Sequence, residues 1–350
     1  MDALAARFGG TAYAAIQVAS RLPDDPAIDN VAVVTRAGSL IDHGLREGPS
    51  LCTYRLPSPE RFELSRRIAW EALVLPRMIR RNHACSVLTW SGMLPRSLSA
   101  QTVCYLANPA PFVPDAGRSA RRVAIAWTSR AANAVLVPSA AMAVLAEPYL
   151  SRPPEVVPLG IDHARFFPAA RPGDDVLCIA DFYPHKRHDI VLAAWAALSA
   201  PRPRLRLIGD PRVAPNHARA IAAQVAACRG LGTITVESRL DLSALVAAYW
   251  RARVLLMPSE RESFCMPLLE AQACGVPAVA RDSSVLRDTG GDGTTFMGDD
   301  DPSRWRDALQ TLLEDDVVHA TARATGISHA AGYGWDKTAE KIREALVRAL

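Results

Sequence analysis

Lysine is almost absent from this chain of 350 residues. Three of the 40 basic residues are lysines, at positions 186, 337 and 341, and the other 37 are arginines. A lysine ammonium is a compact point charge, whereas an arginine guanidinium is a planar fork. Lys186, the only lysine before position 337, therefore has two interpretations. Either its identity is chance, or position 186 needs a compact cation.

Several motifs that define common protein classes are also missing. The seven cysteines are scattered, with no CxxC and no HExxH, so we expect reduced thiols in a cytoplasmic protein and no metal site. A Walker A loop, a GxSxG turn and a complete GxGxxG are absent, which argues against P-loop enzymes, α/β-hydrolases and dinucleotide-binding dehydrogenases. The uncharged segment 131–146 is too short to span a bilayer, and no secretory signal is expected. Aromatic residues make up only 6% of the chain, and nothing resembles a nucleic-acid module, so no nucleic acid partner is expected.

The positive charge is concentrated in the first part of the chain. The net charge is +4, and residues 1–150 hold 16 arginines against 11 acidic residues. The basic clusters are Arg66 and Arg67; Arg77, Arg80 and Arg81; and Arg118, Arg121 and Arg122. These clusters are either an ordinary solvated surface or an attraction for an anionic acceptor or for the inner face of a membrane, which would give peripheral membrane contact.

Short apolar runs alternate with helix-length segments along the chain. The expected strands are 30–35, 85–90, 102–106, 134–138, 155–158, 176–180, 204–208, 233–236, 254–257 and 278–280. The expected helices include 11–21, 60–80, 190–198, 214–229 and 242–250. Such alternation predicts an α/β protein with parallel sheets and helices on both faces.

The length and a proline-rich stretch predict two domains. A chain of this length exceeds one typical domain, and residues 151–158 are the best linker. We therefore expect an N-terminal domain over 1–152 and a second domain over 153–334. A closing helix over 335–350 would pack back toward the N-terminal domain.

The segment 257–280, MPSERESFCMPLLEAQACGVPAVA, carries the strongest pattern. A strand enters a polar loop, and Pro267 suits the first turn of a helix over 268–274, which Gly275 and Pro277 end. This order places a helix N-terminus at the carboxyl end of a strand, where open α/β sheets bind ligands and free amides hold phosphate.

Two glutamates bracket the start of that helix, eight positions apart. Glu262 lies in the loop and Glu270 in the expected first turn. Taken singly, Glu270 could simply complement the helix dipole, and Glu262 could be a solvated acid like Glu260. Their joint spacing with the proline and glycine positions favours a ligand site.

The pattern ExSFxxPxxEAxACGxPxxA resembles the Glu-x7-Glu signature of the retaining, nucleotide-sugar-dependent glycosyltransferases of family 4. These enzymes have the GT-B fold, in which two Rossmann-like domains face each other across a cleft. Segments 157–168, 180–189 (ADFYPHKRHD) and 207–210 resemble further parts of the family's donor domain, and 133–139 resembles the last strand of its acceptor domain. The resemblance is strong over about 155–345 and weak before 100.

The resemblance implies roles for individual residues. Glu270 would hydrogen-bond the ribose of the nucleotide, Glu262 would contact the donor sugar, and Lys186 would neutralise the leaving diphosphate. The other implied contacts with the donor or acceptor are Ser263, Phe264, Cys265, Met266, Gly9, Gly10, Arg187, Gly209, Arg239 and Asn108.

The chain departs from the family in three places. Asp181 stands where the family often has an arginine, and Arg187 follows the lysine instead. Only eight residues precede Gly9, so the family's usual first strand before the glycine loop is missing, either because the start is truncated or because that strand is contributed in an unusual way. The acceptor-domain histidine is not evident, and Asn108 lies near its expected place.

The expected activity is transfer, with retention, of a sugar from a nucleotide-diphosphate donor to a glycan, a lipid-linked acceptor or a small molecule. No cofactor or metal is expected. Another GT-B enzyme, such as a sugar-nucleotide epimerase or a phosphorylase, is an alternative. A catalytically degenerate subunit of a glycosylation complex is a second one.

Overall fold

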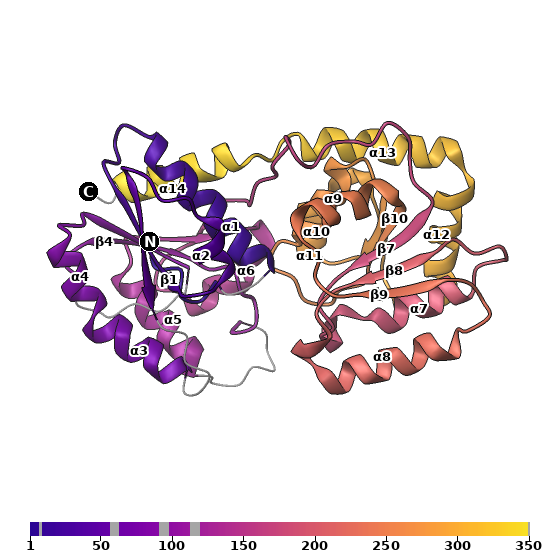
Figure 1. Ribbon diagram of the computed structural model, residues 1–350, viewed down its shortest axis with the longest axis horizontal. Coiled ribbons are helices and arrows are strands. Elements are labelled where there is room, and N and C mark those ends of the chain that lie inside the picture. Colours follow the sequence, from indigo (N-terminus) through magenta and orange to yellow (C-terminus); the bar gives the residue numbers. More distant parts are fainter. Residues whose placement is uncertain (7–8, 57–62, 91–97, 113–119, 349–350) are drawn as a thin grey trace. The chain divides into compact units, whose positions relative to one another are not determined.

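The protein is described by a computed structural model over residues 1–6, 9–56, 63–90, 98–112 and 120–348. The chain forms two compact units (Figure 1). The first unit comprises Met1–Gly160 together with Trp335–Leu350, and the second comprises Ile161–Gly334. Parallel sheets in both units confirm the predicted α/β class.

The first unit is built on one parallel sheet with a short central segment. Its strands are β1 (Val31–Arg36), β2 (Leu51–Leu56), β3 (Ser86–Thr89), β4 (Gln101–Tyr105), β5 (Ala134–Val137) and β6 (Glu155–Val156). The order β2-β1 is joined to β3-β4-β5-β6 by the N-terminal residues, because Asp2 bridges to both Val34 and Thr89. The amide of Asp2 donates to the Leu88 carbonyl at 2.8 Å, and that of Ala3 donates to the Val34 carbonyl at 3.0 Å.

The described residues before Gly9 include no strand, as expected, but residues 1–3 lie hydrogen-bonded between β1 and β3. Asp2 forms isolated parallel bridges with Val34 of β1 and with Thr89 of β3. Two features hide this segment in the sequence. It is shorter than any period-2 pattern that could be recognised, and it carries a buried aspartate.

Seven helices are described in the first unit. They are α1 (Gly9–Arg21), α2 (Leu40–Gly44), α3 (Glu63–Leu73), α4 (Leu75–Arg81), α5 (Ala120–Ala131), α6 (Ala140–Ala146) and α14 (Trp335–Arg348). The single helix expected over 60–80 is two helices, because Pro76 lacks an amide hydrogen and starts a new helix at its first turn. Helix α14 packs beside α1, where the Trp335 ring meets the Tyr13 ring edge-on at 5.9 Å.

The second unit contains a six-stranded parallel sheet in the order β12-β11-β10-β7-β8-β9. Its strands are β7 (Asp175–Ile179), β8 (Leu205–Ile208), β9 (Ile234–Glu237), β10 (Ala252–Met257), β11 (Ala278–Arg281) and β12 (Thr294–Met297). Its helices are α7 (His188–Ala196), α8 (Pro215–Ala227), α9 (Leu242–Arg251), α10 (Met266–Ala273), α11 (Ser284–Gly290), α12 (Pro302–Glu314) and α13 (Asp316–Ala330). Figure 1 shows α7 and α8 on one face of this sheet and α9 and α10 on the other.

The strand order of the second unit reverses between β7 and β10. From β7 the chain continues outward through β8 and β9, and from β10 it continues the other way through β11 and β12. The helices that follow these two adjacent strands, α7 and α10, therefore lie on opposite faces of the sheet (Figure 1). A crevice at the carboxyl ends of such strands is the usual ligand position in open α/β sheets.

Candidate functional site

Two loops meet at the point where the strand order reverses. One joins β7 to α7 and contains Lys186, and the other joins β10 to α10 and contains Glu262. The backbone already links them, since the amide of Glu260 donates a hydrogen bond to the carbonyl of His185 at 2.8 Å. The residues that the sequence pattern selected therefore lie where the topology predicts a ligand.

Lys186 and Glu262 form an ion pair between these loops. The Lys186 Nζ lies 2.6 Å from the Glu262 Oε1, and the two side chains are 17% and 13% exposed. Burial by itself would lower the pKa of Lys186, but the Glu262 carboxylate, together with Cys265 and Asp181, raises that pKa above its usual value. The lone lysine of the first 336 residues is thus held charged at the sheet's carboxyl end.

The start of α10 directly follows the loop that carries Glu262. Cys265 precedes the helix in a left-handed conformation, with φ +73°. The hydroxyl of Thr289, in α11, donates a hydrogen bond to the Phe264 carbonyl and so holds the β10–α10 loop. Among the described residues, the amides of Phe264, Cys265 and Met266 have no hydrogen-bond acceptor. Unpaired amides at the positive end of a helix form an anion site.

Glu270 is buried within α10, and its Oε2 accepts a hydrogen bond from the Tyr249 hydroxyl at 2.8 Å. Burial raises the pKa of Glu270 to about 7, and the Tyr249 bond partly opposes that rise. Because α10 begins at Met266, Glu270 lies one turn deeper than expected, and the first turn holds no acid. Complementing the helix dipole therefore does not explain Glu270. Sequence reasoning missed Tyr249, because a tyrosine in an apolar helix reads as core.

Two further arginines predicted at the site are paired with carboxylates. Arg239 holds Asp181, the residue that stands in the place of the family's arginine, through two guanidinium nitrogens. Arg187 contacts three carboxylates from three segments. Gly209 has a packing role, because a Cβ there would lie 2.0 Å from the Ala180 carbonyl oxygen.

The other predicted residues fall on both units. Ser263 lies in the β10–α10 loop, between Glu262 and the unpaired amides. Gly9 and Gly10 open α1 in the first unit, where Gly9 has φ +61°. Asn108 is exposed in the same unit, and its Oδ1 accepts from the Ala110 amide at 2.9 Å.

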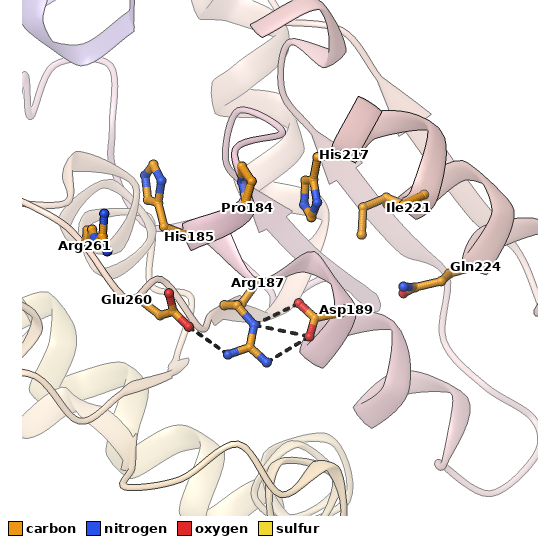
Figure 2. A pocket seen from close by; sticks show the side chains of 10 residues that line it. Pro184, His185, Arg187, Asp189, His217, Ile221, Gln224, Glu260 and Arg261 are labelled. Carbon is orange, nitrogen blue, oxygen red and sulfur yellow. Dashed lines mark hydrogen bonds and ion pairs between the residues drawn. The ribbon is translucent and has the colours of Figure 1, made fainter. Parts of the chain in front are cut away.

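A pocket of about 660 Å³ flanks the Lys186 loop on the side of α8. Figure 2 shows Arg187 in this pocket between Glu260 and Asp189, with His217 of α8 on its wall. Among the described residues, no group of three or more histidine, cysteine, aspartate or glutamate side chains is placed to hold a metal ion. No helix in the described ranges is long and apolar enough to cross a membrane.

Comparison with known proteins relates the second unit to glycosyltransferases. Residues 173–315 match the family model described as "Glycosyl transferases group 1". The D-inositol 3-phosphate glycosyltransferase of Thermobispora bispora is 31% identical over 184 residues, which cover 50% of this chain and 43% of that protein. The same-named protein of Kineococcus radiotolerans is 32% identical over 224 residues, 56% of this chain and 52% of that protein. The chain thus spans about half the length of the curated relatives it matches.

Solved structures are similar over nearly the whole chain. The sucrose-phosphate synthase of Thermosynechococcus elongatus superposes with a TM-score of 0.82 at 20% identity, covering 97% of this chain and 93% of that one. The HepE protein of Anabaena, in complex with UDP and glucose, gives a TM-score of 0.78 at 15% identity, covering 99% and 98%. The chain therefore has the GT-B fold, and its second unit carries a region of the glycosyl transferases group 1 type.

Proposed function

We propose that the protein is a retaining glycosyltransferase of family 4 that uses a nucleotide-diphosphate sugar. The observation that carries this proposal is the pairing of Lys186 with Glu262 beside the unpaired amides that open α10. A compact cation, a helix N-terminus and a carboxylate then meet where the strand order reverses. That combination suits a diphosphate joined to a polyhydroxylated sugar.

In the proposed reaction the bond between the sugar's anomeric carbon and the diphosphate oxygen breaks, and the diphosphate keeps the electron pair. Lys186 and the amides stabilise the negative charge that grows on this leaving group. The acceptor hydroxyl oxygen bonds to the anomeric carbon from the same face, and its proton passes to the leaving phosphate. Glu262 orients the sugar, and Glu270 accepts hydrogen bonds from the ribose. We propose that these groups suffice without a metal ion.

The names of similar proteins suggest which nucleotides and acceptors to test first. Several neighbours were solved with UDP or UDP-glucose, and the matched relatives are named as D-inositol 3-phosphate glycosyltransferases. We propose a nucleotide-sugar donor and a hydroxyl-bearing acceptor that is a glycan, a lipid-linked sugar or a small molecule. The fold alone leaves an epimerase, a phosphorylase and an inactive subunit as alternatives.

The test has two stages. Thermal shifts are measured with UDP, GDP, UDP-glucose and GDP-mannose, and then nucleotide release is assayed from whichever sugar nucleotide stabilises the protein, with and without acceptor sugars and with EDTA. A transferase releases nucleotide faster with an acceptor, and the product's anomeric configuration by NMR decides retention. Binding without any release would favour the inactive subunit. Loss of activity in EDTA would contradict the metal-independent reaction.

A second proposal concerns the basic surface of the first unit. Across α3 and α4, residues 66–83 include four exposed arginines and only one acid, the buried Glu71. Ile68, Leu73 and Val74 are exposed among these arginines. We propose that this face rests on an anionic membrane surface, such as the inner face of the cytoplasmic membrane. Arg118 lies outside the described residues, as do the side chains of Arg121 and Arg122.

Vesicle sedimentation tests the membrane proposal. We expect binding to phosphatidylcholine vesicles that contain phosphatidylglycerol, weaker binding at high salt, and none to phosphatidylcholine alone. A variant with Arg77, Arg80 and Arg81 changed to glutamine should lose binding and keep nucleotide affinity. Equal binding by that variant would contradict the proposal.

A further inference from the structure

Arg187 has a backbone conformation that arginine normally avoids. It lies between Lys186 and the first residue of α7, with φ +52°, in the left-handed region that favours glycine. Such conformations persist only where surrounding contacts hold them, and they gather at functional sites. The contacts of the Arg187 side chain show what holds it.

The Arg187 guanidinium is bound by carboxylates from three separate segments. Its Nη2 lies 2.9 Å from the Oδ2 of Asp189 in the first turn of α7. Its Nη1 lies 2.8 Å from Glu260 Oε1 in the β10–α10 loop and 2.5 Å from Asp300 Oδ2 after β12. The hydrogen bond with Asp189, followed by those with Asp300 and Glu260, raises the pKa of Arg187 further above its usual value.

The network extends to Pro258, the first residue of the β10–α10 loop. Arg281 donates to Asp300 Oδ1 at 2.5 Å and to the Pro258 carbonyl at 3.0 Å. The loop that carries Glu262 is therefore held at Pro258 and again at Glu260. On the other side, Arg187 is covalently next to Lys186. The two arginines and three carboxylates therefore connect the segments that carry Lys186 and Glu262.

The charges exclude a simple anion-binding role for Arg187. Two guanidinium groups face the carboxylates of Asp189, Glu260 and Asp300, so the cluster has an excess of negative charge. A phosphate would have to displace carboxylates that already occupy the guanidinium donors. Lys186, with one carboxylate partner and unpaired amides nearby, remains the cation suited to the diphosphate.

We propose that Arg187 is a positioning residue that locks the β7–α7 and β10–α10 loops together and sets the geometry between Lys186 and Glu262. The structural part of this inference stands on its own, and its consequence for turnover rests on the proposed glycosyl transfer. This positioning role differs from the substrate contact that the sequence resemblance implied for Arg187.

The scarcity of lysine provides a direct measurement. N-hydroxysuccinimide acetate labels amines, and mass spectrometry reports Lys186 relative to Lys341, which is exposed on α14. The side chain of Lys186 is largely buried in its ion pair, so it should label slowly in the wild-type protein. Arg187→Gly removes the guanidinium and places glycine where the backbone favours it, so the variant should fold. The Lys186/Lys341 labelling ratio should rise about twofold or more, which corresponds to the weakest coupling expected between contacting residues.

Two other variants complete the labelling test. Glu260→Gln should raise the ratio in the same direction, and its effect should not add fully to that of Arg187→Gly. Arg253→Ala is the matched control, because Arg253 is also ion-paired and largely buried in this unit, with Asp316 at 2.6 Å. It should leave the ratio unchanged. An unchanged ratio in Arg187→Gly, or an equal rise in Arg253→Ala, would overturn the proposal.

Turnover then tests the functional consequence. With the sugar nucleotide selected by thermal shift, Arg187→Gly should lower kcat roughly 10- to 100-fold, as small misplacements of catalytic groups do, with little change in KM. Arg187→Lys should recover part of the loss. A rise in KM with kcat unchanged would assign Arg187 to substrate binding instead. If the wild-type protein releases no nucleotide, the proposed function fails, and the labelling ratio still decides the positioning role.

Discussion

Each unit buries a glutamate with a strongly raised pKa, yet the two sites differ in what surrounds the carboxyl group. Glu71 in the first unit pairs with Arg67 at 2.9 Å, and burial, followed by the nearby Asp2, raises its pKa to about 8. Glu270 in the second unit has a pKa raised to about 7 by burial, and its described partner is a neutral tyrosine hydroxyl.

The position in the sheet separates the two glutamates further. Glu71 interacts with Asp2, which bridges β1 and β3 within the first unit's sheet. The Asp2 carboxylate accepts hydrogen bonds from the Leu4 amide and the Thr89 hydroxyl, so the polar group beside Glu71 already has partners in the interior. Glu270 follows the carboxyl end of β10, in the helix whose first amides are unpaired among the described residues. A perturbed pKa therefore does not identify a ligand site. Unused donors at the carboxyl ends of the strands distinguish the surroundings of Glu270 from those of Glu71.

The largest expected effect is at Lys186, whose charge should act on the leaving group. Lys186→Met should lower kcat/KM by about 10²-fold or more, or ~2–4 kcal/mol, by analogy with loss of one preorganised donor. Lys186→Arg should also fail substantially, because a planar fork on a longer stem does not fit a point-charge site. Steady-state kinetics of both variants decides. Full activity of Lys186→Met would remove Lys186 from the site.

The next largest expected effect is on nucleotide affinity, and it distinguishes the two buried glutamates. Glu270→Ala should weaken nucleotide binding by ~1.5–3 kcal/mol, roughly 10- to 150-fold, because it loses charge-assisted hydrogen bonds to the ribose. Glu71→Gln, in the other unit, should leave nucleotide affinity unchanged. Isothermal titration calorimetry with UDP measures both. Equal losses in the two variants would mean that general destabilisation, and not ribose contact, explains Glu270.

Glu71 should instead govern the pH dependence of stability. Its folded pKa of about 8 lies above the unfolded value of 4.5, so the folded state retains a proton that the unfolded state releases. Its stabilising contribution is complete below about pH 4.5 and is lost as the pH rises toward 8. Glu71→Gln remains neutral, so the loss of unfolding free energy between pH 5 and 8 should shrink by on the order of 2 kcal/mol. Urea titrations at the two pH values test this, and an unchanged pH dependence would place the titration elsewhere.

The sequence predicted the second unit far better than the first. Strands such as β7 and β10 are apolar runs followed by turn residues. The glutamate spacing located the β10–α10 loop, and the family resemblance of residues 180–189 located the β7–α7 loop. The expected strands did not include β2 or β12, and the bridges that Asp2 forms to β1 and β3 were not expected either. Each of these segments is short or carries polar residues among its apolar ones. Helices α12 and α13 were also missed in a region that the sequence analysis left unassigned.

The site's partners could not be predicted in the same way. Lys186 and Glu262 were selected from a resemblance, but their 2.6 Å contact depends on two loops that are 76 positions apart in the chain. The pairing of Arg187 with Asp300 spans 113 positions. No local pattern encodes such contacts. The left-handed backbone at Arg187 and Cys265 is equally invisible, because the residues found there are not glycine or asparagine.

The smallest expected effect concerns that left-handed backbone at Cys265. The side chain is buried beside the unpaired amides, so a substitution changes the local strain and the space next to the donor. Cys265→Gly removes a left-handed penalty of roughly 1–2 kcal/mol, partly offset by the greater freedom of glycine in the unfolded chain. Cys265→Ala keeps the penalty and loses the same sulfur. The glycine variant should therefore be more stable than the alanine variant by about 1 kcal/mol in urea denaturation. If the alanine variant is equally stable, the left-handed conformation at position 265 carries little free-energy penalty, which would contradict this prediction.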